Sequence, residues 1–272
     1  MNSIVSRLAL AATAAIAFGS SAAPTAPDPA LVAAVADPGR TASFVARDPA
    51  RHPAQELAVF GTNPAMTVVE LWPGGGYWTE ILGPYLAKGG GTYYAALNAP
   101  GDAEEDKGVE RWRARMAAEK DRLGTIHETV LGAGHFDIAP AGSADLVVTF
   151  RNLHNWMNGG YADQALAAAF KALKPGGILG IEEHRGRNDK PQDPKAADGY
   201  VRQDYAVALA KKAGFVLVAS SEINANPKDT KDWVDGVWTL PPALSQGDKD
   251  RAKYLAVGEA DNFVLKFQKP LH

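Results

Sequence analysis

Short apolar runs alternate with longer amphipathic stretches from Met66 to Lys269. Seven runs have the length and composition of strands, at 66–71, 91–98, 125–131, 144–150, 178–185, 215–221 and 261–269. Four stretches have apolar residues at helical spacing, at 77–87, 103–124, 161–177 and 197–214. This alternation predicts an α/β fold with a mostly parallel, doubly wound sheet and helices on both faces. In the first helix, Pro84 is expected to cause a kink or an early end.

Two segments fall outside the alternation. Residues 23–65 are rich in Ala, Pro and Asp, and they contain one expected helix after Pro53. Residues 222–260 show little periodicity, and a loop of that length in a compact domain is usually functional or disordered. We therefore expect an N-terminal extension at 23–65 and an α/β domain at 66–272, with an insertion at 222–260.

The first residues have the composition of an export signal. Arg7 supplies a positive charge, Leu8 to Phe18 form a short apolar core, and small residues precede Ala23. The core is too short to span a bilayer, so we expect a cleaved signal peptide at 1–22 and a periplasmic or secreted protein. The alternative is an Ala-rich N-terminal arm. No membrane insertion is expected after cleavage.

The composition limits the partners and the kinds of site that the chain can have. The chain has 272 residues, 46% of them hydrophobic, which suits one medium-sized domain. Its formal charge is −3 with acids and bases interspersed, so nucleic acid is not an expected partner. It contains no cysteine, which excludes a thiol nucleophile, a disulfide and a thiolate metal site. The sequence does not indicate an oligomeric state.

The stretch "VVELWPGGGYWTEIL" carries the strongest local signal. A buried strand ends at Glu70 and is followed by three glycines, Gly74, Gly75 and Gly76, and then by a helix. Glycines allow a ligand to approach the backbone, and a helix N-terminus offers free N–H groups to an anionic or nucleoside ligand. The alternative is a tight turn that requires positive φ. The residues after the glycines fit neither a P-loop nor the G-x-G-x-x-G dinucleotide pattern.

These residues resemble the first motif of the class I S-adenosylmethionine-dependent methyltransferases, acid-x-Gly-x-Gly-x-Gly. Glu70, Gly74 and Gly76 match it, whereas Trp72 replaces the first glycine. The stretches "SADLVVTFRNLHNW" and "AFKALKPGGILGIEEH" resemble the fourth and fifth strands of the same family. The resemblance implies a seven-stranded sheet with an antiparallel last strand and S-adenosylmethionine as cofactor. With "RDPARHPAQELAVFG", the motifs resemble a group of exported bacterial methyltransferase-like proteins.

Two positions depart from the family pattern. Trp72 either keeps the cofactor away from the backbone or forms a wall of its pocket. Asn98 stands where the family has an acid for the ribose hydroxyls, and an amide makes hydrogen bonds without charge assistance. Asn98 could equally be a plain turn residue.

The resemblance also indicates candidate site residues after the fourth strand. His154 is a candidate base or substrate anchor, with Asn155 beside it, and Arg151 and Asn152 are expected next to the cofactor. Asp137 lies where the family often contacts adenine. The alternatives are a structural histidine at His154 and a solvated loop acid at Asp137.

His184, beside Glu182, Glu183 and Arg185, is expected near His154 at the carboxyl edge of the sheet. A His/Glu metal site is conceivable there, but the spacing matches no zinc motif, so no metal is expected. The insertion at 222–260 is predicted to form a lid with Trp233 or Trp238 facing His154. The alternative is a surface loop that the tryptophans fix to a helix.

Two functions remain open at this point. The first is a methyltransferase that acts on a small or medium-sized substrate. The second is an exported, non-enzymatic small-molecule-binding protein that kept the fold, and the expected export favours it because S-adenosylmethionine is made in the cytoplasm.

The export prediction can be tested on protein from its native host. We expect removal of the first residues near Ala22, because small residues at this point are typical of a cleavage site. Intact-mass measurement of the isolated protein reports the N-terminus directly. A full-length cytoplasmic species would contradict the prediction.

Overall fold

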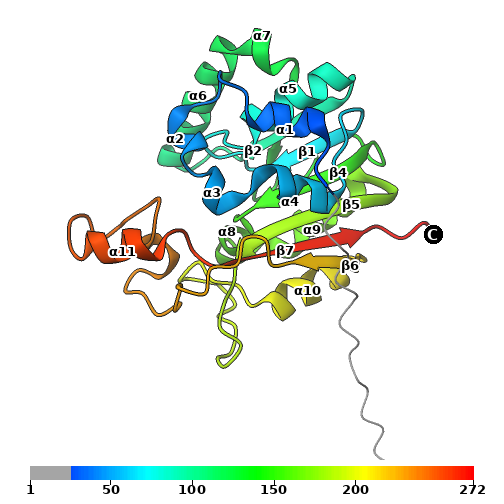
Figure 1. Cartoon of the computed structure of the whole chain (residues 1–272). Helices are drawn as coiled ribbons and strands as arrows, with labels where there is room; N and C mark the ends of the chain where they lie inside the picture. The colour runs from blue at the N-terminus through cyan, green and yellow to red at the C-terminus, as the bar shows by residue number, and fades with distance from the viewer. Residues whose placement is uncertain (1–25) are drawn as a thin grey trace, which may run out of the picture.

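The computed structural model describes residues 26–272, so the expected signal peptide lies outside the described residues. Its centre is a seven-stranded sheet with the order β3-β2-β1-β4-β5-β7-β6 (Figure 1). β7 runs antiparallel to β5 and β6, and the other strands are parallel to one another, which confirms the predicted topology. The strands are β1 Thr67–Leu71, β2 Thr92–Asn98, β3 Ile126–Leu131, β4 Ala144–Phe150, β5 Leu173–His184, β6 Val216–Ser221 and β7 Asn262–Gln268.

Helices cover both faces of the sheet because neighbouring strand residues point to opposite sides. In β1, Val68 belongs to one buried core and Val69 to the other. The Val68 side is covered by α1 Pro29–Val35, α4 Pro53–Phe60, α5 Thr79–Gly89, α6 Ala103–Ala118 and α7 Lys120–Leu123. The Val69 side is covered by α8 Leu153–Asn158, α9 Ala162–Ala172 and α10 Gln203–Lys212.

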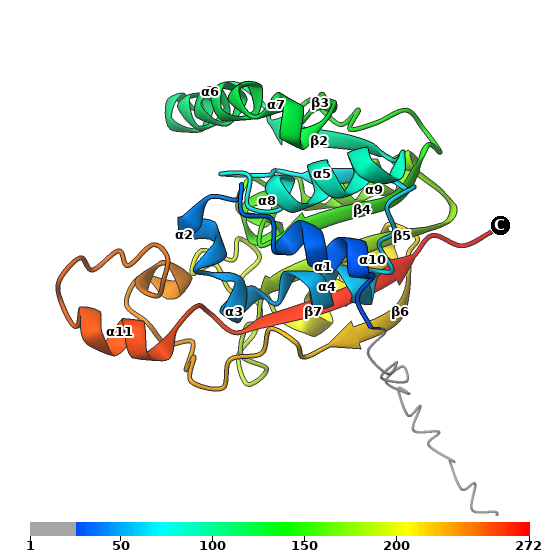
Figure 2. The same cartoon turned by 45° about the horizontal axis from the view of Figure 1, so that its top comes forward.

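The N-terminal extension forms part of this core. α4 confirms the one helix that the sequence predicts, and three further helices precede it: α1, α2 Ala42–Val45 and α3 Asp48–Arg51. α1 begins after Asp28, whose carboxylate accepts a hydrogen bond from the amide of Ala30 at 2.9 Å. Its Leu31 is inaccessible to solvent and packs in the core beneath α5, beside which α1 lies in Figure 2.

Pro84 does not end α5, so the early end that the sequence offered as one of two outcomes does not occur. The helix continues to Gly89. A proline removes the hydrogen bond to the carbonyl four residues earlier, which here belongs to Glu80. That carbonyl instead accepts a bond from Nη1 of Arg122 at 3.4 Å. A neighbouring side chain therefore replaces part of what the helix loses.

α10 is shorter than the predicted helix at 197–214. Gly199 has a φ of 78°, and Val201 forms a β-bridge with Arg185 beside the end of β5. These residues therefore run along the sheet edge before the helix begins at Gln203.

The insertion is packed and contains two short elements, η1 Gly236–Thr239 and α11 Arg251–Val257. Its small apolar core consists of Val237, Leu240, Tyr254 and Ala260, together with Tyr200, which precedes the insertion in sequence. Because β6 and β7 are antiparallel, the insertion leaves and re-enters the sheet at one edge, as predicted. In Figure 1 it lies at the end of the sheet opposite the C-terminus. Within residues 26–272, no helix is both long and apolar enough to cross a bilayer.

The buried position of Leu31 predicts that the extension stabilises the domain. Leu31→Ala should lower the free energy of unfolding by about 2–5 kcal/mol, as truncation of a buried leucine does. Val32 in the same helix is 47% exposed, so Val32→Ala should change it by less than about 0.5 kcal/mol. Urea denaturation measures both. Equal, small effects would show that α1 is not part of the cooperative core.

Candidate functional site

The glycine turn, residues 72–76, connects β1 to α5 at the carboxyl edge of the sheet. Trp72, Gly74 and Gly76 have φ values of 53°, 55° and 90°. Glycine adopts such angles without strain, whereas a side chain such as that of Trp72 does so rarely. The alternating glycines of the motif therefore reflect the backbone conformation as well as any ligand.

Glu70 supports the turn from behind. Its carboxylate is buried and accepts hydrogen bonds from the hydroxyls of Tyr93 and, at 3.3 Å, Thr79. Burial raises the pKa of Glu70 to about 7, despite these two hydrogen bonds. Since Thr79 is the first residue of α5, Glu70 fixes the start of the helix relative to β1.

The glycines face different surroundings. A Cβ at Gly74 would meet nothing within 4 Å, whereas one at Gly76 would lie 2.5 Å from Nη2 of Arg115. Gly76 therefore accommodates a side chain of α6, and Gly74 faces open space. The amides of Gly74 and Gly75 donate no hydrogen bond to the described part of the chain.

A first pocket, of about 190 Å³, opens beside Gly74. It is lined by Pro73, Gly74, Leu97, Asn98, Glu105, Gly108, Val109 and Trp112. Asn98 thus lies at the end of β2 as predicted, and its Nδ2 donates to Glu105 at 3.2 Å. Asp137 does not line this pocket. It is exposed and paired with Lys171 at 2.8 Å, which lowers its pKa.

The ring of Trp72 extends across the end of β2. Its backbone amide donates to Ala96 of β2, and its Nε1 donates to the carbonyl of Leu131, at the end of β3, at 2.8 Å. The ring packs edge-on against Trp156 and also contacts Tyr161. Trp72 therefore occupies space at the carboxyl ends of β2 and β3.

Asn152 joins the glycine turn to the link between β4 and α8. Its Nδ2 donates to the carbonyls of Leu71 and Trp72 at 3.1 and 3.2 Å. His154 is two residues further on, so the same link positions the turn and the candidate base. The side chain of Arg151 turns to a second pocket instead.

The second pocket, of about 310 Å³, contains the predicted histidines. It is lined by Arg47, Arg51, Phe150, Arg151, His154, Asn155, His184, Val237, Trp238, Pro241, Pro242, Ala243, Glu259 and Ala260. The rings of His154 and His184 are 5.4 Å apart, as expected from their strand positions. Trp238 lies edge-on to His154 at 5.9 Å, whereas Trp233 packs against Tyr254.

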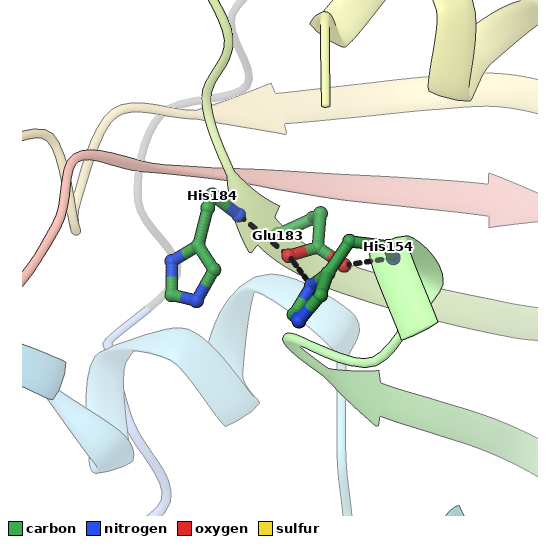
Figure 3. Close-up of side chains that lie close together, drawn as sticks. All are labelled: His154, Glu183 and His184. Atoms are coloured by element: carbon green, nitrogen blue, oxygen red, sulfur yellow. Dashed lines mark hydrogen bonds and ion pairs between the residues drawn. The ribbon is translucent and has the colours of Figure 1, made fainter. Parts of the chain in front are cut away.

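Glu183 orients both histidines (Figure 3). Its Oε1 accepts hydrogen bonds from Nδ1 of His154 at 2.9 Å and from the amide of His184 at 2.8 Å. Its Oε2 accepts a bond from the amide of His154 at 3.0 Å. Burial alone would raise the pKa of Glu183, but His154 and His184 outweigh it, and the pKa is lowered. Glu183 is therefore a carboxylate at neutral pH.

This arrangement fixes the imidazole tautomers. Since Glu183 accepts from Nδ1 of His154, Nε2 is left as the acceptor when the ring is neutral. Nδ1 of His184 lies 2.8 Å from Oδ1 of Asn262, to which it donates when neutral. Burial lowers the pKa of His184 to about 4, although Glu183 opposes this. In Figure 3, the ring nitrogens outside these bonds, Nε2 of His154 and Nε2 of His184, point toward the same side of the site.

The same three residues, His154, Glu183 and His184, could be considered as a metal site because their ligand atoms lie within 4.8 Å of one another. However, both oxygens of Glu183 already accept hydrogen bonds from the histidines. Three arginines also line the pocket, and their charge disfavours a cation.

Sequence reasoning placed His154 and His184 together with Trp233 or Trp238, of which Trp238 is the one beside His154, but it missed Arg47, Arg51 and Glu259. "RDPAR" was a visible motif, yet nothing in its spacing indicated a partner at Glu259, more than two hundred residues away. The role of Glu183 was missed as well, although its place beside His184 was a signal.

Comparisons with known proteins agree with the fold. No protein-family model matches the chain, and no curated protein matches its sequence. Similar solved structures include an S-adenosylmethionine-dependent methyltransferase from Aquifex aeolicus, with 16% identity, a TM-score of 0.54, and coverage of 89% of this chain and 98% of that chain. An arsenic(III) S-adenosylmethionine methyltransferase from Chlamydomonas reinhardtii has 16% identity, a TM-score of 0.50, and coverage of 90% and 74%.

The cyclase SpnF is similar as well, with 13% identity, a TM-score of 0.56, and coverage of 82% of each chain. At these identities the likeness defines the fold alone, and it is the class I methyltransferase fold. Since one protein of this fold is a cyclase, the reaction must be argued from the site.

The low pKa of His184 predicts a specific pH dependence. Because its pKa is about 4 in the folded protein and about 6.5 in an unfolded chain, the unfolded state binds the proton more readily between these values. The contribution of His184 to the free energy of unfolding is therefore fully present above about pH 6.5 and is lost as the pH falls toward 4. NMR titration of the His184 ring should give a midpoint near 4, and His184→Gln should remove this part of the acid destabilisation. A midpoint near that of a free histidine would contradict the buried, neutral state.

Proposed function

We propose that the protein is a class I S-adenosylmethionine-dependent methyltransferase that acts on a small molecule. One observation carries this proposal: the open glycine turn and the His154–Glu183 pair meet at one sheet edge. Asn152 bonds to the turn while its own backbone leads to His154, so the two pockets share a rigid link. This is the edge at which open α/β sheets bind ligands.

The residues at the first pocket fit part of the cofactor. The free amides of Gly74 and Gly75 and the side chain of Asn98 could hold its polar groups. When bound, S-adenosylmethionine would supply a methyl group activated by a sulfonium. The ring of Trp72 limits the space toward β3, so we propose that it reduces affinity rather than excludes the cofactor.

The chain itself would supply proton removal and positioning. Nε2 of His154 accepts the proton of the acceptor's nucleophile, and the carboxylate of Glu183 stabilises the resulting imidazolium through Nδ1. His184, neutral at pH 7, adds no competing charge. Trp238 and the prolines of the insertion line the second pocket, so we propose that residues 222–260 act as a lid that shields it from water.

A second function has one specific observation in its favour. If Trp72 blocks the cofactor entirely, the second pocket would belong to a small-molecule-binding protein that kept the fold. The proposed periplasmic or secreted location, shared with the exported group that the motifs resemble, is consistent with this alternative because S-adenosylmethionine is not expected outside the cytoplasm.

Calorimetric titration with S-adenosylmethionine distinguishes the methyltransferase from the binding protein. We expect binding to the parent protein and at least about tenfold tighter binding to Trp72→Gly, because glycine adopts the φ of 53° without strain and removes the ring. Trp233→Phe is the matched control, since Trp233 packs within the insertion, and its affinity should equal that of the parent. No binding to either the parent or Trp72→Gly would rule out the methyltransferase and leave the binding protein.

A further inference from the structure

Three arginines from distant segments meet in the second pocket around one carboxylate. Arg47 precedes α3 and Arg51 is its last residue, Arg151 follows β4, and Glu259 precedes β7. Nε and Nη2 of Arg47 donate to Glu259 at 2.7 and 3.1 Å. Nε of Arg51 donates at 3.1 Å, and Nη1 of Arg151 at 3.2 Å.

This cluster has more donors than acceptors. Each guanidinium carries five N–H groups, whereas a carboxylate accepts about four hydrogen bonds, and Glu259 already receives four. Within residues 26–272, both Nη atoms of Arg51 and Nη1 of Arg47 donate to no protein acceptor. Arg51 as a whole residue is only 4% exposed, but these nitrogens keep some access to solvent. An anion that enters the pocket can therefore accept hydrogen bonds from them.

The nearby carboxyl groups do not supply one. Glu182 lies 3.7 Å from Nε of Arg151, and its other oxygen accepts a bond from Asn224 at 2.9 Å, which also donates to Glu56. Burial, together with the charge of Glu182, raises the pKa of Glu56 well above its ordinary value and so disfavours its carboxylate form. Glu183 is committed to the histidines. Glu259 is thus the one carboxylate among the residues that line the pocket.

Apart from Asn155 and His184, the remaining lining is apolar. It includes Phe150, Val237, Trp238, Pro241 and Pro242, and the pocket has a volume of about 310 Å³. A volume of this size suits a small molecule. A ligand that fits this pocket would therefore combine an anionic end with an apolar body.

We propose that the second pocket binds a small organic anion, a carboxylate or phosphate monoester on an apolar body, through the unused N–H groups of Arg47 and Arg51. Given the proposed function, this anion is the methyl acceptor, and its hydroxyl or amine is held at Nε2 of His154. A planar guanidinium matches either anion with paired hydrogen bonds. Charged recognition at one end leaves the apolar end beneath Trp238.

Ligand binding without any cofactor tests this proposal. Benzoate and phenyl phosphate are titrated against the full chain at constant ionic strength with EDTA present, and the neutral isostere benzamide is the reference. Calorimetry should show at least about tenfold tighter binding of one or both anions than of benzamide. The tighter anion identifies which group the pocket prefers. Equal affinity for benzamide, or no measurable binding of either anion, would overturn the proposal.

Variants assign the binding to the arginines. Arg51→Gln should weaken anion binding at least about tenfold and leave benzamide unchanged, because only charge-assisted donors are lost. Arg47→Gln is the second variant and is used if Arg51→Gln fails to fold. The side chain of Arg47 is 22% exposed, so its removal leaves less uncompensated charge in a buried position. Arg187→Gln, at an exposed arginine paired with Asp189, is the matched control and should change nothing. Unchanged anion affinity in a folded Arg51 or Arg47 variant would overturn the assignment.

The result is separable from the proposed function. Arginine-dependent anion binding without any affinity for S-adenosylmethionine would sustain the anion site and remove the methyltransferase. Cofactor binding without a preference for anions would remove the anion site and leave the methyltransferase intact.

Discussion

The carboxylate of Glu259 is the contact on which the second pocket depends. It joins Arg47 and Arg51 of the extension to Arg151 of the sheet, and it lies in the insertion itself. Three segments that are distant in sequence therefore meet at one ionic cluster. Because these charges are largely buried, loss of one partner would leave the others without compensation, which usually costs several kcal/mol. The extension and the insertion are thus walls of the site and not additions to a complete domain.

The fold was predictable from the sequence because its signals are local. Alternation in β1 places Val68 and Val69 in different cores, and amphipathic helices follow at regular intervals. α2 and α3, in contrast, have four residues each, too few to show a period, and α1 has seven. Where α5 continues through Pro84, the carbonyl that the proline leaves without its helical bond accepts one from Arg122, a tertiary contact. Where only a distant residue decides the outcome, the local pattern gives the wrong or an incomplete prediction.

In the candidate site, too, the features set by strand order were predictable and those set by distant side-chain contacts were not. Chain topology brings the ends of β4 and β5 together, so the proximity of His154 and His184 followed from their strand positions. The direction of the Trp72 ring did not, because it depends on the carbonyl of Leu131 and on packing against Trp156. Gly76 also has a packing role that the motif did not indicate, since it makes room for Arg115. A motif gives positions along the backbone, and the side chains around it decide how much space remains.

The arginine cluster and the low pKa of His184 are physically linked. After burial, the charges of His154 and Arg151 contribute to lowering the pKa of His184, while Glu183 opposes them. An anion bound beside the arginines would offset part of that positive potential and so raise the pKa of His184. By thermodynamic reciprocity, protonation of His184 would then strengthen binding of the same anion. The charge that selects the ligand would in this way also act on the protonation of a histidine in the same pocket.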